Sequence, residues 1–299
     1  MEDAVHSHLE EPFAIKIVNL RWTLASRKAC GKKRHDPLPS LMMVSGSRTV
    51  GLCLGADVPT NNVMDKWVTG TLLSRMDPAT RTALLRVAPA RSFPKGTVLI
   101  GQDDALTDFA FILRSDSPNL TACVKVMGRL ADGRDGLLGI RLSGDIVGEL
   151  GALHRQPRSA TVTACSKVWA HKVTAAVLLQ FLQEHPQTWL ALNATMADRL
   201  QWANQRRLDF AGFPVHVRLA RVLLVLSGQH GRSVEPTGRS LGVALSHEEL
   251  GMLIGAGKDA VYQAVSMLKR NGLITSAYRS IVITDEVGLR HVAEPDPDH

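Results

Sequence analysis

The sequence predicts an α+β protein in which a β-roll comes first, a long helix follows, and a smaller helical domain with a two-stranded hairpin comes last. Three observations predict this fold class. Short strand-like runs separated by turn signals fill residues 97–173, which is typical of a β-roll or barrel. Apolar residues recur every three or four positions over residues 187–210. Two short helical patterns flank a glycine within residues 246–270.

The part of the chain that leads into the roll has a helical pattern. Apolar residues recur with helical spacing from Val63 to Ala90, and Asp77-Pro78 is typical of a helix start within this stretch. Turn signals such as Gly101-Gln102-Asp103 then separate short apolar runs, and residues 115–119 predict a surface loop. We expect strands at Thr97–Ile100, Asp108–Leu113, Ala122–Met127, Leu137–Leu142, Arg158–Ala164 and Lys167–Val173.

Two helices are expected directly after the roll. The first runs from about Thr174 to Glu184, and His185-Pro186 separates it from a second helix at about Gln187–Phe210. A hinge at Gly212-Phe213-Pro214 then leads into a further helix over Val215–Leu226. The apolar stripe of the second helix fits either an ordinary core face or a seam between two chains, and it consists of Trp189, Leu192, Met196, Leu200 and Ala203.

Length and composition indicate a two-domain protein outside the membrane. The chain has 299 residues, of which 45% are hydrophobic and 5% aromatic, so two domains with real cores are the natural expectation. No apolar run approaches the roughly 20 residues that a membrane span needs, and the acidic N-terminus is unlike a secretory signal. We therefore expect a cytoplasmic protein. The four cysteines are scattered, so we interpret them as structural or incidental rather than as a disulfide framework or a metal site.

The net charge of +7 does not by itself locate a nucleic-acid surface. Residues 66–185 carry 15 Lys and Arg against 10 Asp and Glu, whereas residues 213–299 carry 9 against 9. The basic excess therefore lies outside the C-terminal region, and charge alone does not indicate that this region binds DNA.

Residues 1–65 predict a poorly organised N-terminal extension. A basic run at Lys32-Lys33-Arg34-His35 is followed by prolines and a Gly/Ser patch. These features fit a flexible arm that touches nucleic acid or a solvated extension. A translation start placed too far upstream is a further alternative, with Met64 as the other candidate start.

The most informative stretch runs from Gly144 to Ala164. Its Gly148-Glu149-Leu150-Gly151 segment holds too much glycine for an ordinary strand, and such a turn can aim successive backbone N–H groups at one anion. Glu149 adds an acceptor suited to a sugar hydroxyl. Arg158 and Ser159 add a guanidinium and a hydroxyl that can hold the same anion from another side. For a lone Glu149–Arg158 pair, the alternative is a surface ion pair.

This order of residues resembles the phosphate-binding cassette of cyclic-nucleotide-binding domains in CRP/FNR regulators. The resemblance rests on Gly148-Glu149-Leu150 and on Arg158-Ser159-Ala160 after a short loop. It implies that Glu149 holds the ribose 2′-hydroxyl, and that Arg158 and Ser159 hold the cyclic phosphate. In the family the long helix forms the homodimer and its middle contacts the base. Here Ala203-Asn204 stands in that middle region, where the family's best-known member has two hydroxyl residues, so Asn204 joins the candidate ligand residues.

Residues 246–270 contain the second informative motif. Ser246, followed three positions later by Glu249, is a capping box. Gly255 permits a tight turn between two short helices, and a wing of two strands is expected over residues 273–284 around a turn at residues 278–280. This order is similar to the C-terminal winged helix-turn-helix domain of the same family, in which the second helix enters the major groove.

Two departures from the family pattern affect this motif. Gly257 replaces the usual serine cap, and glycine is a weaker cap. Lys258-Asp259 and Gln263 stand where the best-known member has arginine, glutamate and a second arginine. Since lysine is a point donor and glutamine prefers adenine edges, we expect DNA binding at a different sequence. The candidate DNA-binding residues are Ser246, His247, Gly257, Lys258, Asp259, Ala260, Tyr262, Gln263 and Arg279.

Together the motifs predict a homodimeric DNA-binding transcriptional regulator that a cyclic nucleotide controls allosterically. Cyclic AMP is the expected effector, and no metal or catalytic role is expected. The expected partners are double-stranded DNA, a second copy of the chain and RNA polymerase. Alternatives are a regulator of the same family with another ligand or none, a protein-docking helix-turn-helix, and an enzyme. The predicted parts are the extension 1–65, the nucleotide-binding roll 66–185, the dimerisation helix 186–212 and the winged helix-turn-helix domain 213–299.

Overall fold

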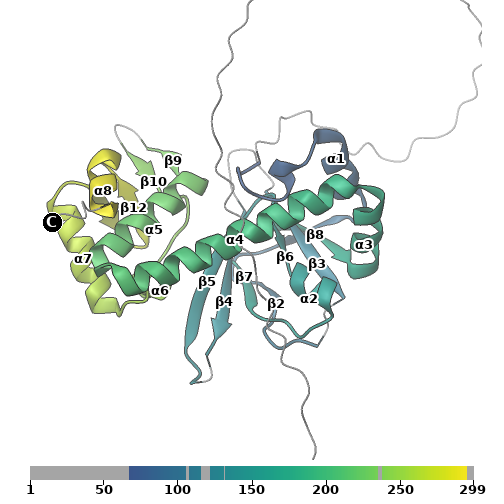
Figure 1. Ribbon diagram of the computed structural model, residues 1–299, viewed down its shortest axis with the longest axis horizontal. Helices are drawn as coiled ribbons and strands as arrows, with labels where there is room; N and C mark the ends of the chain where they lie inside the picture. Colours follow the sequence, from purple (N-terminus) through teal and green to yellow (C-terminus); the bar gives the residue numbers. More distant parts are fainter. Residues whose placement is uncertain (1–66, 106–107, 116–121, 131, 235–237, 295–299) are drawn as a thin grey trace, which may run out of the picture. The chain divides into compact units, whose positions relative to one another are not determined.

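The computed structural model describes residues 67–105, 108–115, 122–130, 132–234 and 238–294. The predicted N-terminal extension and most of the predicted loop at residues 115–119 lie outside the described residues. Within the described chain, a roll of two β-sheets leads into a long helix and then into a helical domain with a small sheet of its own (Figure 1).

The roll consists of two four-stranded sheets in which all neighbouring strands are antiparallel. Apolar side chains from both sheets form one buried cluster that includes Ile100, Phe111 and Val162. One sheet has the order β1 (Ala90–Phe93), β8 (Val168–Thr174), β3 (Phe109–Arg114) and β6 (Ile146–Val147). The other has the order β2 (Val98–Ile100), β7 (Thr161–Ala164), β4 (Cys123–Arg129) and β5 (Asp135–Leu142).

Short helices cover the roll, and their buried residues join a second cluster that includes Leu84 and Phe181. Asp77 caps one of them, because its side chain accepts hydrogen bonds from the N–H groups of Ala79 and Thr80. These helices are the 3₁₀ turn η1 (Leu73–Arg75), α1 (Pro78–Arg86), α2 (Glu149–His154) and α3 (Ala175–Glu184).

The long helix α4 (Pro186–Gly212) has 27 residues, which corresponds to about 40 Å. His185 lies between α3 and α4 outside helical geometry, and Pro186 opens α4 at a position where its missing N–H costs nothing. In Figure 1 this helix runs from α3, past the strands of the roll, to the helices of the C-terminal domain.

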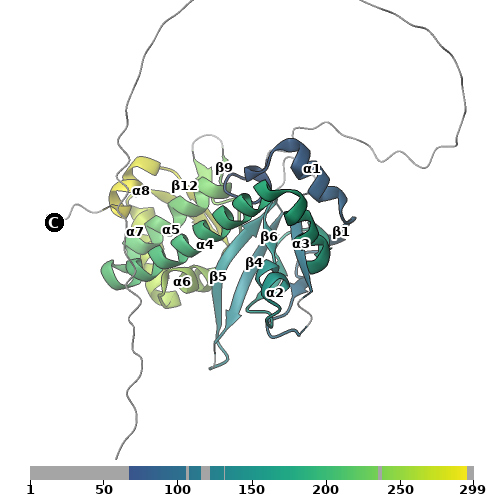
Figure 2. The ribbon, with the colours of Figure 1, turned by 45° about the vertical axis from the view of Figure 1, so that its right-hand side comes forward.

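The C-terminal domain packs its helices on a third sheet. Its core includes Leu223, Leu253 and Leu268, and Leu137 of β5 is buried in the same cluster. Figure 2 shows α6 beside β5. The helices are α5 (Val215–His230), α6 (His247–Ile254), α7 (Lys258–Arg270) and α8 (Glu286–Ala293). The sheet has the order β11 (Ile274–Ala277), β12 (Ser280–Ile283), β10 (Arg239–Ser240) and β9 (Arg232–Ser233).

The predicted fold class is confirmed, and several local expectations are corrected. The strand expected from Arg158 begins only at Thr161, and the helical pattern over residues 63–90 contains a 3₁₀ turn, α1 and the start of β1. The glycine-rich segment at Gly148 caps the short helix α2 rather than forming an isolated turn. Strands β1, β6, β9 and β10 and helix α8 were not expected.

Candidate ligand-binding pocket and nucleic-acid interface

The roll and α4 line a cavity of about 470 Å³ that is open to solvent on one side. Gly148, Glu149, Leu150, Arg158 and Ser159, the roll residues expected to bind a ligand, all line it. Asn204 is exposed on α4 and does not line the cavity of its own chain. The apolar part of the lining comes from β2, β4, β5, β6, β7 and α4, and it includes Ile100, Val126, Leu138, Val147, Val162, Met196 and Leu200.

Gly148 sets the backbone conformation at the N-terminus of α2. Its φ is +81°, and a Cβ at this position would lie 2.6 Å from Cδ1 of Ile100 and 2.9 Å from Nη1 of Arg158. Any other residue would therefore strain the backbone and displace the arginine. Because α2 begins at Glu149, its first N–H groups have no partner within the helix, which leaves donors at the edge of the cavity.

Glu149 is buried, with 5% of its surface exposed. Its Oε1 accepts a hydrogen bond of 2.9 Å from Nη1 of Arg199. Its Oε2 is buried and has no hydrogen-bond partner. A buried carboxylate oxygen without a partner is costly, so this atom is suited to accept a hydrogen bond from a hydroxyl that enters the cavity.

Arg158 reaches the same cavity from the loop before β7, with 3% of its surface exposed. Its guanidinium donates to the carbonyl of Gly148 at 2.6 Å and to that of Phe109 at 2.7 Å. It also lies 4.5 Å from the centre of the Phe109 ring. Burial lowers the pKa of Arg158, and the carboxylates of Asp108 and Asp104 act in the opposite direction. Arginine remains charged under such a shift, so a buried cation faces the cavity.

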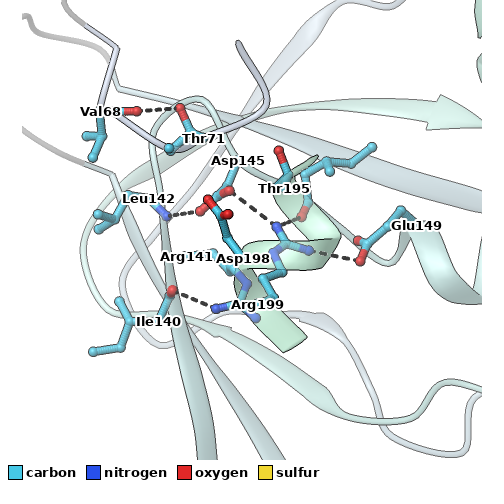
Figure 3. Close-up of polar contacts among 12 residues, drawn as sticks. Val68, Thr71, Ile140, Arg141, Leu142, Asp145, Glu149, Thr195, Asp198 and Arg199 are labelled. Carbon is cyan, nitrogen blue, oxygen red and sulfur yellow. Dashed lines mark hydrogen bonds and ion pairs between the residues drawn. The ribbon is translucent and has the colours of Figure 1, made fainter. Parts of the chain in front are cut away.

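Arg199 is a site residue that the sequence analysis did not identify. In Figure 3 it extends from α4 between Asp145 and Glu149. Its Nη2 lies 3.2 Å from Oδ1 of Asp145 and donates to the carbonyl of Ile146 at 2.7 Å. One signal could have found it, because Arg199 lies one turn before Ala203 on the helix expected to contact the base.

Arg141 of β5 is a further cation that lines the cavity. Its Nη1 donates to the carbonyl of Ile140 at 2.9 Å, as Figure 3 shows. Burial and then the charge of Arg199 lower the pKa of Arg141 to about 10, although Asp145 raises it. The cavity therefore combines three arginines with one carboxylate that has an unpaired oxygen, a combination that favours a small anionic ligand carrying a hydroxyl.

The second candidate site is built by α6, α7 and the wing. The predicted capping box is present, because Ser246 and Glu249 exchange side-chain and backbone hydrogen bonds. Gly255 takes the turn between the helices with φ +62°, and a Cβ there would lie 3.2 Å from the Phe210 ring. Gly257 caps α7 without a side-chain hydrogen bond, as the sequence predicts.

Helix α7 buries one face and exposes the other. Val261, Val265 and Leu268 face the core, whereas the expected DNA-binding residues Lys258, Asp259, Tyr262 and Gln263 are exposed, and Ala260 is half-buried. His247 of α6 lies near this face, with its ring centre 6.0 Å from that of Tyr262 and the two ring planes tilted by 60°. In the wing, Arg279 is exposed and has φ +55°. The α7 side chains are therefore presented to solvent beside His247, and Arg279 is presented from the wing.

Lys125 of β4 connects the roll to the C-terminal domain. Its ammonium forms an ion pair with Oε1 of Glu249, the capping-box residue of α6, and donates to the carbonyl of Ala244 at 3.2 Å. Burial raises the pKa of Glu249, but hydrogen bonds from Lys125 and Ser246 and the charges of Lys125 and Arg279 lower it, and the net shift is downward.

Arg206 of α4 makes a second connection. It donates to the carbonyl of Leu138 in β5 at 3.0 Å and to that of Leu253 in α6 at 3.4 Å. Its guanidinium lies 4.0 Å from the centre of the Trp202 ring. Leu138 also lines the ligand cavity. Strand β5 and helix α4 therefore both line the cavity and are linked to α6, the first helix of the helix-turn-helix, through Arg206.

Comparisons with known proteins agree with this architecture. A model of the cyclic nucleotide-binding domain matches residues 90–185, and a model of the Crp-like helix-turn-helix domain matches residues 217–292. The cAMP-activated global transcriptional regulator CRP of Escherichia coli is 27% identical over 192 residues, which are 64% of this chain and 87% of that relative. The CRP-like cAMP-activated global transcriptional regulator of Mycobacterium tuberculosis is 27% identical over 216 residues, with coverages of 72% and 92%.

Solved structures share the fold at low sequence identity. The c-di-GMP-responsive global regulator CLP of Xanthomonas campestris aligns with a TM-score of 0.59 and 21% identity, over 69% of this chain and 99% of that one. FixK2 of Bradyrhizobium japonicum aligns with a TM-score of 0.57 and 22% identity, over 70% and 98%.

A cyclic nucleotide-binding domain followed by a Crp-like helix-turn-helix defines a class of DNA-binding transcription regulators. The chain belongs to the CRP/FNR family of transcriptional regulators. Among the helices that the structure describes, none combines the length and the apolar character needed to cross a bilayer.

Proposed function

We propose that this regulator is a homodimer whose DNA binding is controlled by cyclic AMP held in the cavity between the roll and α4. The observation that carries the proposal is the buried, unpartnered Oε2 of Glu149 in a cavity that Arg158 also lines. A ribose 2′-hydroxyl would satisfy that oxygen, and the cyclic phosphate would lie against Arg158 and Ser159. Relatives that are named as cAMP-activated support the choice of effector.

The exposed face of α4 supports the homodimer. Leu190 and Leu208 are each 66% exposed, and Leu200 is 64% exposed. An ideal helix turns about 100° per residue, which places Asn204 between Leu200 and Leu208 on one side. A second copy of α4 would cover these leucines, and Asn204 would then lie at the dimer seam, where its amide could contact the base.

Residues 66–185 would accordingly form the effector domain, residues 186–212 the dimerisation helix, and residues 213–299 the domain that reads DNA. The exposed side chains of α7 would enter the major groove, and Arg279 of the wing would contact a phosphate. A dimer would place two copies of α7 about one DNA turn apart. RNA polymerase would be the partner through which such a complex acts.

Calorimetric titration with cyclic AMP and with 2′-deoxy cyclic AMP tests the assignment of Glu149. We expect wild-type protein to bind cyclic AMP more tightly by about 1.5–3 kcal/mol, because only the ribose form donates to the charged carboxylate. Glu149→Ala should remove this preference while Arg199 keeps Asp145 and the Ile146 carbonyl as partners. Arg91→Ala, on exposed β1 away from the cavity, is the matched control.

Two results would oppose this proposal. Equal affinity of the wild-type protein for both nucleotides would remove Glu149 as the ribose acceptor. Binding of cyclic di-GMP, the effector named for the Xanthomonas regulator, without any binding of cyclic AMP would remove cyclic AMP as the effector.

A further inference from the structure

Cys123 of β4 lies opposite Cys165, the residue that directly follows β7. Val124 of β4 pairs with Ala164 of β7 in antiparallel register, so the next pair in that register is Cys123 with Cys165. The Cys165 N–H donates to the Cys123 carbonyl at 2.8 Å, which extends the ladder to this pair. Opposed residues in such a ladder have Cα atoms about 4.5–5.5 Å apart, and a disulfide accommodates about 4.4–6.8 Å. The Cα separation typical of opposed residues therefore lies within the range that a disulfide spans.

The two thiols interact and differ in exposure. Cys123 is buried and Cys165 is partly exposed. The hydrogen bond from the Cys123 thiol is the main cause that lowers the pKa of Cys165, and the charge of Lys125 lowers it further, although burial opposes the shift. The same hydrogen bond and burial raise the pKa of Cys123. Cys165 is thus the more nucleophilic sulfur and the one that a small oxidant can reach.

We propose that Cys123 and Cys165 form a reversible disulfide when a hydroperoxide oxidises the protein. The Cys165 thiolate attacks one oxygen of hydrogen peroxide, so that an S–O bond forms, the O–O bond breaks and hydroxide leaves. The Cys123 sulfur then attacks the Cys165 sulfenic acid, so that the S–S bond forms, the S–O bond breaks and water leaves. In total, two thiols lose two electrons and one peroxide is reduced to two waters.

The cross-link would add a covalent bond between two strands that ladder hydrogen bonds and buried apolar side chains already hold together. It would close a loop of about 40 residues that contains β5, β6 and α2, and cross-linking a loop of this length restricts the unfolded chain substantially. Oxidised protein should therefore melt at a higher temperature than reduced protein.

Peroxide treatment of the full-length chain with Cys30→Ser and Cys53→Ser tests the proposal, because only the two opposed thiols then remain. After catalase removes the oxidant, we expect both thiols to be consumed together, with a mass decrease of two hydrogens. Trypsin cleaves after Arg114, Lys125, Arg158 and Lys167 and so places the cysteines in separate short peptides. Those two peptides should be linked within one chain, and dithiothreitol should release them.

The Cys123→Ala variant separates the two chemical steps. Without the resolving sulfur, Cys165 should remain as a sulfenic acid that dimedone labels, and oxidation should no longer raise the melting temperature. In the protein that retains both cysteines, over-oxidation of Cys165 beside an intact Cys123 thiol would overturn the proposal. So would a disulfide between chains, or two thiols that survive a peroxide dose sufficient to oxidise an exposed cysteine in a reference peptide.

Discussion

At the residue scale, the cavity depends on a few ionised side chains that each have a specific partner. Arg199 neutralises one oxygen of Glu149 and leaves the other for a ligand. Arg158 is held by two backbone carbonyls, so its position is set before a phosphate arrives. Such preorganisation reduces the ordering that binding would otherwise require.

Burial of His230 is expected to make the fold sensitive to acid. Nδ1 of His230 bonds to the Leu241 carbonyl in the C-terminal core, and Nε2 is buried without a partner. Burial lowers the pKa of His230 to about 4, although the bond to Leu241 opposes the shift. Because the pKa in the folded protein is below the unfolded value of about 6.5, the unfolded state binds more protons between these values.

Stability from His230 is therefore fully present above about pH 6.5 and is lost as the pH falls toward 4, by up to about 3 kcal/mol. We expect His230→Asn, whose amide can still donate to Leu241, to reduce this acid sensitivity. Urea unfolding at pH 7 and at pH 4.5 measures the free energy of unfolding that each protein loses over this interval. If the variant and the wild-type protein lose the same stability over this interval, His230 is not the titrating group.

That Gly148, Glu149, Arg158 and Ser159 line one cavity could be predicted from the sequence, because they lie within one short segment. The role of Arg199 could not, because its contact with Glu149 spans 50 positions and depends on where α4 packs. Likewise, the opposition of Cys123 and Cys165 follows from strand register, which scattered cysteines in a sequence do not reveal.

At the element scale, α4 carries the proposed dimer seam. Replacing both Leu190 and Leu208 with glutamate should dissociate the dimer, because each leucine contributes about 1.5 kcal/mol or more when buried. We expect the dissociation constant to rise at least about 100-fold. Sedimentation equilibrium measures this, and Val287→Glu on α8, where the valine is 68% exposed, is the matched control. An unchanged dimer would exclude this face of α4 as the seam.

Helix α7 carries the proposed readout of DNA sequence. Lys258→Ala combined with Gln263→Ala should reduce discrimination between the selected site and random DNA, by about 1–3 kcal/mol for each base that the variant no longer reads. Both side chains are exposed, so the melting temperature should not change. Fluorescence anisotropy on the two duplexes measures discrimination, and Lys269→Ala in the last turn of α7 is the control. Unaltered preference in the double variant would place the reading residues elsewhere.

Elements with strong local signals could be predicted, and those that depend on their neighbours could not. The capping box at Ser246 and the glycine turn at Gly255 define α6 and the start of α7. By contrast, β6 is two residues long and exists because it pairs with β3. Helix α2 could not be predicted, because Gly148 and Gly151 lower the helix propensity of the segment. Both glycines are nevertheless required there, because a Cβ at either position would collide with Arg158.

At the scale of the whole molecule, the cavity and the DNA-binding domain are joined through β4, β5 and α4. Successive side chains of β4 point to opposite faces of the sheet. Lys125 therefore forms the ion pair with Glu249, whereas the next residue, Val126, lines the cavity. Arg206 links the carbonyls of Leu138 and Leu253. A ligand that shifts the cavity lining would therefore act on elements that contact α6. It would couple the two sites by binding one arrangement of these elements more tightly than the other.

DNA affinity measured as a function of cyclic AMP concentration tests most directly whether the cavity controls the DNA-binding domain. For wild-type protein, we expect cyclic AMP to tighten binding to a selected duplex in a saturable manner. Arg158→Ala should move the cyclic AMP midpoint by about 1.5–3 kcal/mol, roughly 10- to 150-fold higher, while Arg91→Ala leaves it unchanged. DNA affinity that is the same with and without cyclic AMP in the wild-type protein would contradict this regulation.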